Sequence, residues 1–158
     1  MTPIEYISAA VIPAALKLLP AQMDSPEARA MLLTSGLQES KFEHRRQVGG
    51  PAEGFWQFET GGGWKGVTGH PASKAHALSV LLTLGYGLPD LNDYYAIEHN
   101  DILACVFARL LLWTHPLSLP KEGHHQYAWD YYISLWRPGL PHRQTWDAFY
   151  DEAWAFNR

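Results

Sequence analysis

The sequence predicts a mainly α-helical fold, a single domain over residues 1–158 with a small irregular or β segment around residues 50–60. Three observations predict it. Hydrophobic residues make up 47% of the 158 residues and charged residues 18%, which is enough to build a buried core without disulfides or metal ions. Apolar residues recur at helical spacing in several segments. That spacing fails between residues 41 and 69.

The first two helices have clear sequence signals. Residues 3 to 19 carry apolar side chains close to every 3.6 positions, and we expect Pro13 to kink or divide this helix. A second helix has Asp24 or Ser25 as its N-cap and Pro26 in its first turn. It runs to about Glu39.

Glycine clusters then replace the periodicity. Gly49-Gly50-Pro51 and Gly61-Gly62-Gly63 are turn signals, and the run Gly54 to Glu59 between them is expected to form one or two short strands or an ordered loop. Further helices are predicted at residues 71 to 84, 100 to 114, 123 to 136 and 141 to 156. The helix at 100 to 114 is apolar around nearly its whole circumference, which is typical of a central, fully packed helix.

Charge and cysteine content exclude several function classes. The net charge is -4, whereas nucleic-acid-binding domains normally carry a basic excess, so we expect no nucleic-acid partner. The single cysteine, Cys105, excludes an internal disulfide and lies in an apolar run, so we expect a buried, inert thiol. No apolar stretch reaches the ~20 residues that span a bilayer, so we expect no stable membrane insertion.

The strongest candidate for chemistry is Glu39. On the second helix it continues a stripe with Leu32 and Ser35 that is expected to pack inward. Loss of solvent and the negative end of the helix dipole both raise the pKa of a carboxyl group there. A carboxylic acid still protonated near neutral pH is what a general acid for glycosidic cleavage requires. The alternative is an exposed glutamate at a helix end.

Two short motifs here resemble those of the lytic transglycosylases and goose-type lysozymes of the lysozyme superfamily. The first, Glu-Ser-x-Phe, is matched by Glu39, Ser40 and Phe42. The second, Gly-Leu-Met-Gln or a close variant, is matched by the run Gly54 to Gln57. The resemblance is close over residues 36 to 58, and beyond them it extends to helical character and length.

The resemblance implies a lysozyme-like fold and a peptidoglycan-degrading glycosidase without a cofactor. Such an enzyme cleaves the β-1,4 bond between N-acetylmuramic acid (MurNAc) and N-acetylglucosamine (GlcNAc), with Glu39 as general acid/base. Ser40 and Gln57 are then cleft residues, and Gln57 orients the sugar next to the scissile bond. Phe55 and Trp56 replace the usual aliphatic pair, and we expect their rings to stack on sugar faces.

The family's third motif, Tyr-Asn-Ala-Gly, is absent. Its nearest stand-in lies in residues 130–139, where Tyr132 is expected to supply a hydroxyl to the cleft. The missing motif favours a second hypothesis, a non-catalytic lysozyme-like protein that binds glycan or serves as a structural part of a virion.

A single-glutamate mechanism fits the carboxylates best. Glu39 would protonate the leaving oxygen while the N-acetyl group of the substrate assists at the anomeric carbon. In lytic transglycosylases the same glutamate then deprotonates the C6 hydroxyl and gives a 1,6-anhydro product, whereas attack by water gives hydrolysis; both outcomes stay open. Glu43, Glu53 and Glu59 are the candidates for a second carboxylate, and we interpret each as a solvated loop charge.

Two other groups of side chains have competing interpretations. The basic residues that follow Glu39 contact peptide-stem carboxylates or form a solvated turn; they are Lys41, His44, Arg45 and Arg46. His124 and His125, with His115 or His142, would be the ligands of a zinc site. No His-Glu-x-x-His motif and no cysteine pair accompanies them, so we expect no metal.

The N-terminal segment has Glu5 in place of a basic n-region and no small-x-small cleavage site. We therefore expect synthesis in a host cytoplasm without a signal peptide. Together with the small size, this resembles bacteriophage endolysins that depend on a holin, or lysozymes carried in the phage particle. The expected partner is the peptidoglycan glycan strand, reached in the periplasm after holin-dependent release or from the virion.

Overall fold

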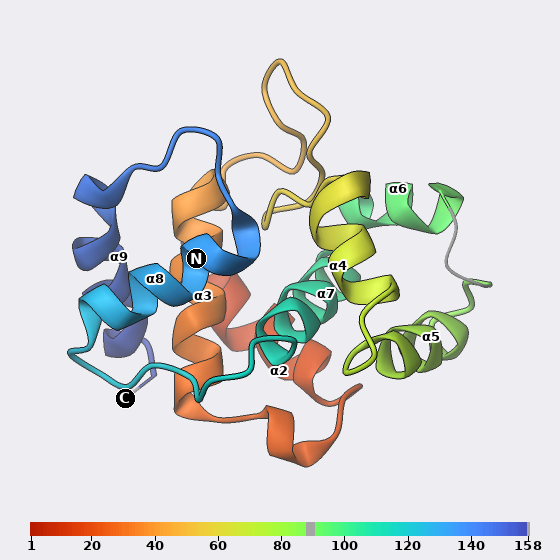
Figure 1. Ribbon diagram of the computed structural model, residues 1–158, viewed down its shortest axis with the longest axis horizontal. Helices are drawn as coiled ribbons and strands as arrows, with labels where there is room; N and C mark the ends of the chain where they lie inside the picture. Colours follow the sequence, from red (N-terminus) through yellow and green to blue (C-terminus); the bar gives the residue numbers. More distant parts are fainter. Residues whose placement is uncertain (88–90, 158) are drawn as a thin grey trace.

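Helix α7 (Asp101–Trp113) lies at the centre of the fold in the computed structural model, which describes residues 1–87 and 91–157 (Figure 1). Asn100 caps its N-terminus, where Oδ1 accepts a 3.0 Å hydrogen bond from the backbone N–H of Leu103. Every residue from Leu103 to Leu112 is buried. The prediction of a fully packed central helix is confirmed, and so is the burial of the Cys105 thiol.

The N-terminal helix is divided, as Pro13 predicts. α1 (Pro3–Tyr6) passes into a π-helical turn, η1 (Ile7–Val11), and then into α2 (Ile12–Leu16). A proline ring clashes with the carbonyl four residues earlier in a regular helix, and the wider π turn before Pro13 gives that ring room. The helical segment ends at Leu16, three residues before the predicted end.

Helix α3 (Pro26–Ser40) begins and ends close to the predicted residues. The Ser25 hydroxyl accepts a 3.0 Å hydrogen bond from the backbone N–H of Ala28, and Pro26 occupies the first turn. The 3₁₀ turn η2 (Ala21–Met23) precedes it. At its other end, Lys41 has a left-handed backbone conformation with φ 54°, which stops the helix.

The last two helices close the fold beside α3. α8 (His125–Trp136) and α9 (Arg143–Ala155) each begin two residues later than predicted. α9 packs along α3, and Figure 1 shows the two side by side on one side of α7. The α8–α9 connector passes near the C-terminal end of α3. This arrangement brings residues 136–142 close to Glu39.

The chain between α3 and α7 differs most from expectation. Residues 44–59 form a loop with two isolated antiparallel bridges, Arg46 to Glu53 and Glu53 to Phe58. Of the two forms expected for Gly54 to Glu59, the ordered loop is the one found. Helical structure then begins earlier than predicted, with the π-helical turn η3 (Thr60–Trp64) and α4 (Lys65–Thr68), followed by α5 (Lys74–Thr83).

Helix α6 (Leu91–His99) was not predicted. Its short sequence shows no run of helical periodicity long enough to identify it, and packing against α7 stabilises it: Tyr94 and Ile97 are both buried in the core. Within the described ranges, none of the helices is long and apolar enough to cross a membrane.

Candidate active site

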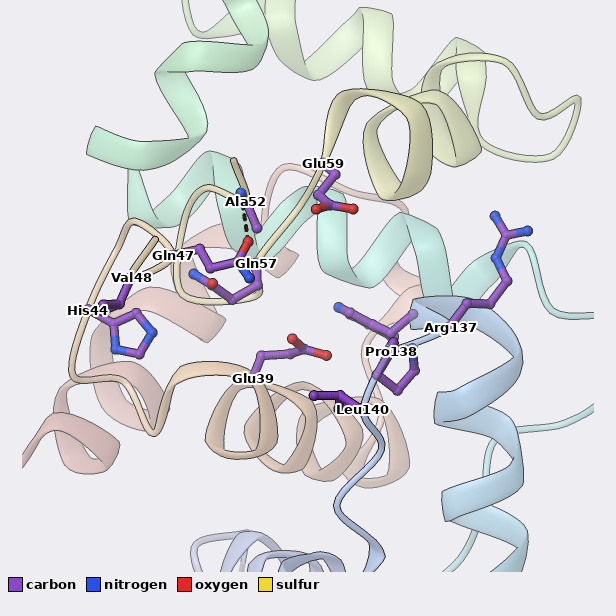
Figure 2. Close-up of a pocket in the computed structure, with 12 residues that line it drawn as sticks. Glu39, His44, Gln47, Val48, Ala52, Gln57, Glu59, Arg137, Pro138 and Leu140 are labelled. Atoms are coloured by element: carbon purple, nitrogen blue, oxygen red, sulfur yellow. Dashed lines mark hydrogen bonds between the residues drawn. The ribbon is translucent and has the colours of Figure 1, made fainter. Parts of the chain in front are cut away.

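Glu39 lies in the last turn of α3, next to a pocket of about 520 Å³. Three stretches of chain line this pocket: the end of α3, the loop 44–59, and the connector 136–140 that follows α8. Figure 2 shows the Glu39 carboxylate directed into the pocket from the wall that α3 forms. The inward placement predicted for Glu39 is therefore confirmed, with a hollow beside it.

A tyrosine from α8 holds the Glu39 carboxyl group. The Tyr132 hydroxyl donates a 2.5 Å hydrogen bond to Oε1 of Glu39. The Tyr132 ring is buried between two tryptophans, with its centroid 4.8 Å from that of Trp146 and 5.7 Å from that of Trp136. Because this stack fixes the ring, the hydroxyl has little freedom to turn away from Glu39. The sequence expectation that Tyr132 supplies a hydroxyl to the cleft itself is corrected: Tyr132 is 2% exposed and lies outside the pocket lining, and its hydroxyl contacts Glu39.

The surroundings of Glu39 raise its pKa to about 7 from an ordinary value of 4.5. The largest cause is burial, which disfavours the charged form. The hydrogen bond from Tyr132 acts in the opposite direction, because it stabilises the carboxylate, and the negative charge of Glu59 raises the pKa further. A share of the Glu39 carboxyl groups therefore keeps its proton near neutral pH.

Ser40 joins the end of α3 to the loop. Its hydroxyl donates a 2.7 Å hydrogen bond to the carbonyl of Phe55 and accepts a 3.1 Å hydrogen bond from the backbone N–H of Phe42. Lys41 and Phe42 are both in the left-handed region, with φ 54° and 56°, a conformation that costs residues other than glycine free energy. Ser40 is buried and lies outside the pocket lining, so its role is to hold this turn and not, as expected, to form the cleft wall.

The helix end also needs Gly36. A Cβ at this position would lie 2.2 Å from the ring of Phe42. The absent side chain lets the Phe42 ring pack against α3, where it meets the edges of Phe55 and Trp56 at centroid distances of 5.6 Å and 5.7 Å. The residues of the two motifs thus form one packed unit beneath the pocket.

Phe55 and Trp56 do not have the positions predicted for sugar-stacking rings. Phe55 is 4% exposed and Trp56 is 0% exposed. The Trp56 indole donates a 2.8 Å hydrogen bond to the carbonyl of Leu32 inside the core. The guanidinium group of Arg45 covers the Phe55 ring at 4.4 Å. The prediction is corrected: both rings pack the loop onto α3, because burial of large aromatic surfaces outweighs their exposure to a groove.

Gln57 lies where the resemblance predicts, in the pocket wall (Figure 2). Its backbone is left-handed, with φ 53°, and its side-chain amide donates a 2.8 Å hydrogen bond to the carbonyl of Gly54. Gly54 has φ 75°, and a Cβ there would lie 2.7 Å from the side chain of Ile97. This tight turn orients the Gln57 side chain, whose carbonyl oxygen has no protein donor among the described residues.

The three candidates for a second carboxylate, Glu43, Glu53 and Glu59, differ in burial and in position relative to the pocket. Glu53 is buried, 2% exposed, and its backbone forms both bridges of the loop. Glu43 is exposed and lies outside the pocket lining. Glu59 lines the pocket, and Figure 2 shows its carboxylate facing that of Glu39 from the opposite wall. The interpretation as a solvated loop charge is therefore wrong for Glu53, and Glu59 has a place in the site.

The basic residues after Glu39 also divide. Arg45 forms a bidentate ion pair with Asp101 at 2.8 Å and 2.9 Å, which ties the loop to the start of α7. Arg46 lies 3.9 Å from Glu98. His44 lines the pocket. Of the cluster, His44 thus lines the pocket, and Arg45 has a structural role.

The pocket wall formed by residues 136–140 was not identified from the sequence. The Trp136 indole donates a 2.9 Å hydrogen bond to the carbonyl of Trp56, which fixes the wall to the loop. Arg137, with φ 46°, ends α8 and turns the chain past Glu39. The run Arg-Pro-Gly-Leu-Pro at 137–141 indicates a rigid connector, but nothing in it indicates which helix end it passes.

No group of three or more histidine, cysteine, aspartate or glutamate side chains could hold a metal ion among residues 1–87 and 91–157. Two of the histidines considered as zinc ligands have other contacts: His125 pairs with Asp151 at 2.6 Å, and the His115 ring stacks on Tyr131. No protein-family model, curated protein or solved structure matches the chain.

Proposed function

We propose that the chain is a peptidoglycan-cleaving glycosidase of lysozyme-like fold, acting on the β-1,4 bond between MurNAc and GlcNAc with Glu39 as general acid. One observation carries the proposal. A carboxyl group with its pKa raised to about 7 faces a pocket and is held in place by a buried tyrosine. A perturbed carboxyl group in a cleft is typical of a catalytic acid.

The geometry supports a defined proton transfer. Tyr132 occupies Oε1 of Glu39, which leaves Oε2 as the oxygen that carries the proton toward the pocket. Glu39 would donate this proton to the glycosidic oxygen as the bond to the anomeric carbon breaks. The Tyr132 hydrogen bond stabilises the carboxylate that remains, so the same contact that positions the acid also accommodates its product.

The pocket has the form of a groove suited to a polymer. A second hollow of about 420 Å³ adjoins it and shares three lining residues with it, Glu59, Trp136 and Arg137. Gly61 and Gly62 line the extension, and a Cβ at Gly61 would meet nothing within 4 Å. A glycan strand that enters beside His44 can therefore continue past Glu39 and over the glycines.

The biological setting belongs to the same proposal. We take the protein to be phage-encoded and to reach the wall either after holin-dependent release or from the virion. The residues on which the resemblance rests, Glu39, Ser40 and Phe42 with the run Gly54 to Gln57, are the support for this setting.

Clearing of purified peptidoglycan tests the proposed function. We expect the wild-type protein to lower the turbidity of a peptidoglycan suspension and Glu39→Gln to lower the rate by about 10³-fold or more, since the general acid is removed. Glu43→Gln is the matched control, because Glu43 lies four residues away, is exposed and does not line the pocket. It should clear at the wild-type rate.

Mass spectrometry of the released fragments identifies the bond that breaks. Disaccharide-containing fragments indicate glycan cleavage, whereas free stem peptides would indicate an amidase and contradict the proposal. A folded wild-type protein that binds peptidoglycan and releases no fragment would instead establish the non-catalytic hypothesis.

A further inference from the structure

Arg109, on the central helix α7, is buried with its charge unpaired. Its side chain is 2% exposed, and Nε donates a 2.7 Å hydrogen bond to the carbonyl of Met23. Nη1 is buried and has no partner among the described residues. The charge of Asp24 acts on this group, but Arg29 binds the Asp24 carboxylate at 2.8 Å and 2.9 Å. A buried cation without a counter-ion costs a fold free energy, so its retention points to a ligand.

Arg109 lines a second pocket, of about 440 Å³, at the other end of α3 from Glu39. Ser25, the N-cap of α3, lines it too, and Figure 1 shows the α7–α8 connector passing this end of the helix. Its described lining residues are all different from those of the pocket beside Glu39. At a rise of 1.5 Å per residue, α3 separates the two pockets by about 20 Å.

The polar part of this lining favours an anion. Among the described lining residues none is acidic. Burial lowers the pKa of Arg109 to about 10, so the guanidinium group stays charged at neutral pH. Ser25 adds the positive end of the dipole of a 15-residue helix. Its hydroxyl accepts a hydrogen bond from the N–H of Ala28 and donates none to the described residues, so its proton is available to a ligand.

The rest of the lining is apolar. Leu112, Leu117 and Leu119 contribute aliphatic side chains, and Leu117 is 60% exposed. The ring of Trp113 lies 5.5 Å from the guanidinium carbon of Arg109. A ligand that fills this pocket therefore needs an apolar group next to its negative charge, and the volume is that of a small-molecule site.

The connector that forms the outer wall is held in place without a ligand. The Tyr131 hydroxyl donates hydrogen bonds to the carbonyls of Leu112 and Leu117 at 3.0 Å and 3.3 Å. The His115 ring stacks on Tyr131 with centroids 3.7 Å apart, and its Nδ1 accepts the N–H of Leu117 at 3.1 Å. The pocket is thus formed in advance, which lowers the entropy lost on binding.

We propose that this hollow, the Arg109 pocket, binds a small molecule that carries a carboxylate and an apolar group. The carboxylate pairs with the guanidinium group of Arg109 and accepts the proton of the Ser25 hydroxyl, while the apolar group lies against Trp113 and Leu117. A planar carboxylate matches the fork of a guanidinium group. One cation also balances its single charge, whereas a phosphate would bring a second charge into a largely apolar pocket. The proposal does not depend on the proposed glycosidase function.

Calorimetric titration of the wild-type protein with sodium phenylacetate tests the proposal. We expect one molecule to bind per chain, with a Kd of about 1 mM or below. Phenylacetamide has the same shape without the charge and should bind at least about tenfold more weakly, and so should inorganic phosphate. Absence of phenylacetate binding would show that water alone fills the pocket and would overturn the proposal. Equal or tighter binding of the amide or of phosphate would overturn it as well.

A charge added to the pocket wall locates the bound probe without disturbing the core. Gln22 is exposed and lines the Arg109 pocket, so Gln22→Glu should fold normally and weaken phenylacetate binding by about tenfold or more. Gln144→Glu makes the same change at an exposed position outside both pockets and should bind as the wild type does.

Arg137→Gln is the second control, because it removes a guanidinium group from the pocket beside Glu39. It should bind phenylacetate with the wild-type Kd. Arg109→Gln should bind at least about tenfold more weakly, with circular dichroism as the check on its folding. Binding that Gln22→Glu leaves unchanged, or that Arg137→Gln abolishes, would place the probe elsewhere and overturn the proposal.

Discussion

The hydroxyl of Tyr132 donates a 2.5 Å hydrogen bond to Oε1 of Glu39 across a sequence separation of 93 residues. Tyr132 is stacked between Trp136 of its own helix and Trp146 of α9. α9 in turn packs along α3, which carries Glu39. The position of the Glu39 carboxyl group therefore depends on the packing of three helices, α3, α8 and α9.

The pH dependence of cleavage should report Glu39 and its contact with Tyr132. Because the acid must be protonated, we expect kcat/KM to fall on the alkaline side with a midpoint near the pKa of Glu39, about 7. Tyr132→Phe keeps the ring and removes a hydrogen bond that lowers this pKa. In this variant the midpoint of the alkaline fall in kcat/KM should move to a higher pH, by on the order of one pH unit.

Tyr131→Phe is the control for this profile. The Tyr131 hydroxyl bonds to the carbonyl of Leu112 at 3.0 Å, away from Glu39. Its variant loses a buried hydrogen bond as well, but its alkaline limb should coincide with that of the wild type. An unmoved limb in Tyr132→Phe would mean that the hydroxyl does not contact Glu39 in solution.

The raised pKa of Glu39 should also appear in stability. In the folded protein the pKa is about 7, above the ordinary value of 4.5. The contribution of the protonated group is therefore fully present below about pH 4.5 and lost as the pH rises through about 7. Ionisation of Glu39 should cost the wild type about 3 kcal/mol of unfolding free energy by pH 8. Glu39→Gln stays uncharged and escapes this loss.

Urea denaturation at pH 5 and pH 8 measures this difference. We expect Glu39→Gln to be close to the wild type at pH 5 and more stable at pH 8, and Glu43→Gln to show no such divergence. Equal stability of wild type and Glu39→Gln at both pH values would contradict the burial that raises the pKa of Glu39.

Ser40 should matter for stability more than its size suggests. Ser40→Ala leaves the buried N–H of Phe42 and the carbonyl of Phe55 without their partner, and it loosens a turn with two left-handed residues. We expect a loss of about 1–3 kcal/mol in unfolding free energy. Ser134→Ala is the control, because Ser134 is exposed and its hydroxyl bonds only to the carbonyl of Tyr131 within the same helix. Its loss should stay below about 0.5 kcal/mol.

Gly61 tests whether the glycan uses the extension of the groove. A leucine at this position meets no protein atom at its Cβ, so folding should be unaffected. Its side chain would fill the hollow beside Glu59, and we expect kcat/KM on peptidoglycan to fall about tenfold or more, equal to ~1.4 kcal/mol of lost binding.

Gly87→Leu is the matched variant for this experiment. Gly87 also has nothing within 4 Å of its Cβ, and it lies outside the pockets that contain Glu59. It should keep the wild-type rate. Equal rates for the two variants would show that the strand does not pass over Gly61.

Local signals allowed most helices to be predicted from the sequence. Ser25 and Pro26 predict the start of α3, and the apolar circumference of residues 100 to 114 predicts the central helix. Helix α6 was not predicted from the sequence, because its stability comes from contacts of Tyr94 and Ile97 with residues distant in sequence. The π turn η3 escaped because three successive glycines are typical of a loop.

In the candidate site, too, some features follow from local sequence and others only from tertiary packing. The inward position of Glu39 follows from its place on a helix stripe. The burial of Phe55 and Trp56 does not follow from their sequence, because an aromatic residue beside a glycine turn can face either a groove or a core. Only the packing of the loop on α3 decides between a groove and the core, and both rings lie in the core.

The sequence by itself determined a helical chain, one acidic side chain at the end of an inward-facing helix, and the loop that follows it. Only the tertiary structure decided that Glu59 faces Glu39 across the pocket and that the Tyr132 hydroxyl bonds to Glu39. It also decided that residues 136–140 form the third wall of the pocket. The physical reason is the sequence separation over which the two kinds of interaction act. Helix periodicity and capping act over a few residues, whereas a pocket is formed by segments up to about a hundred residues apart that meet because each buries its own apolar surface.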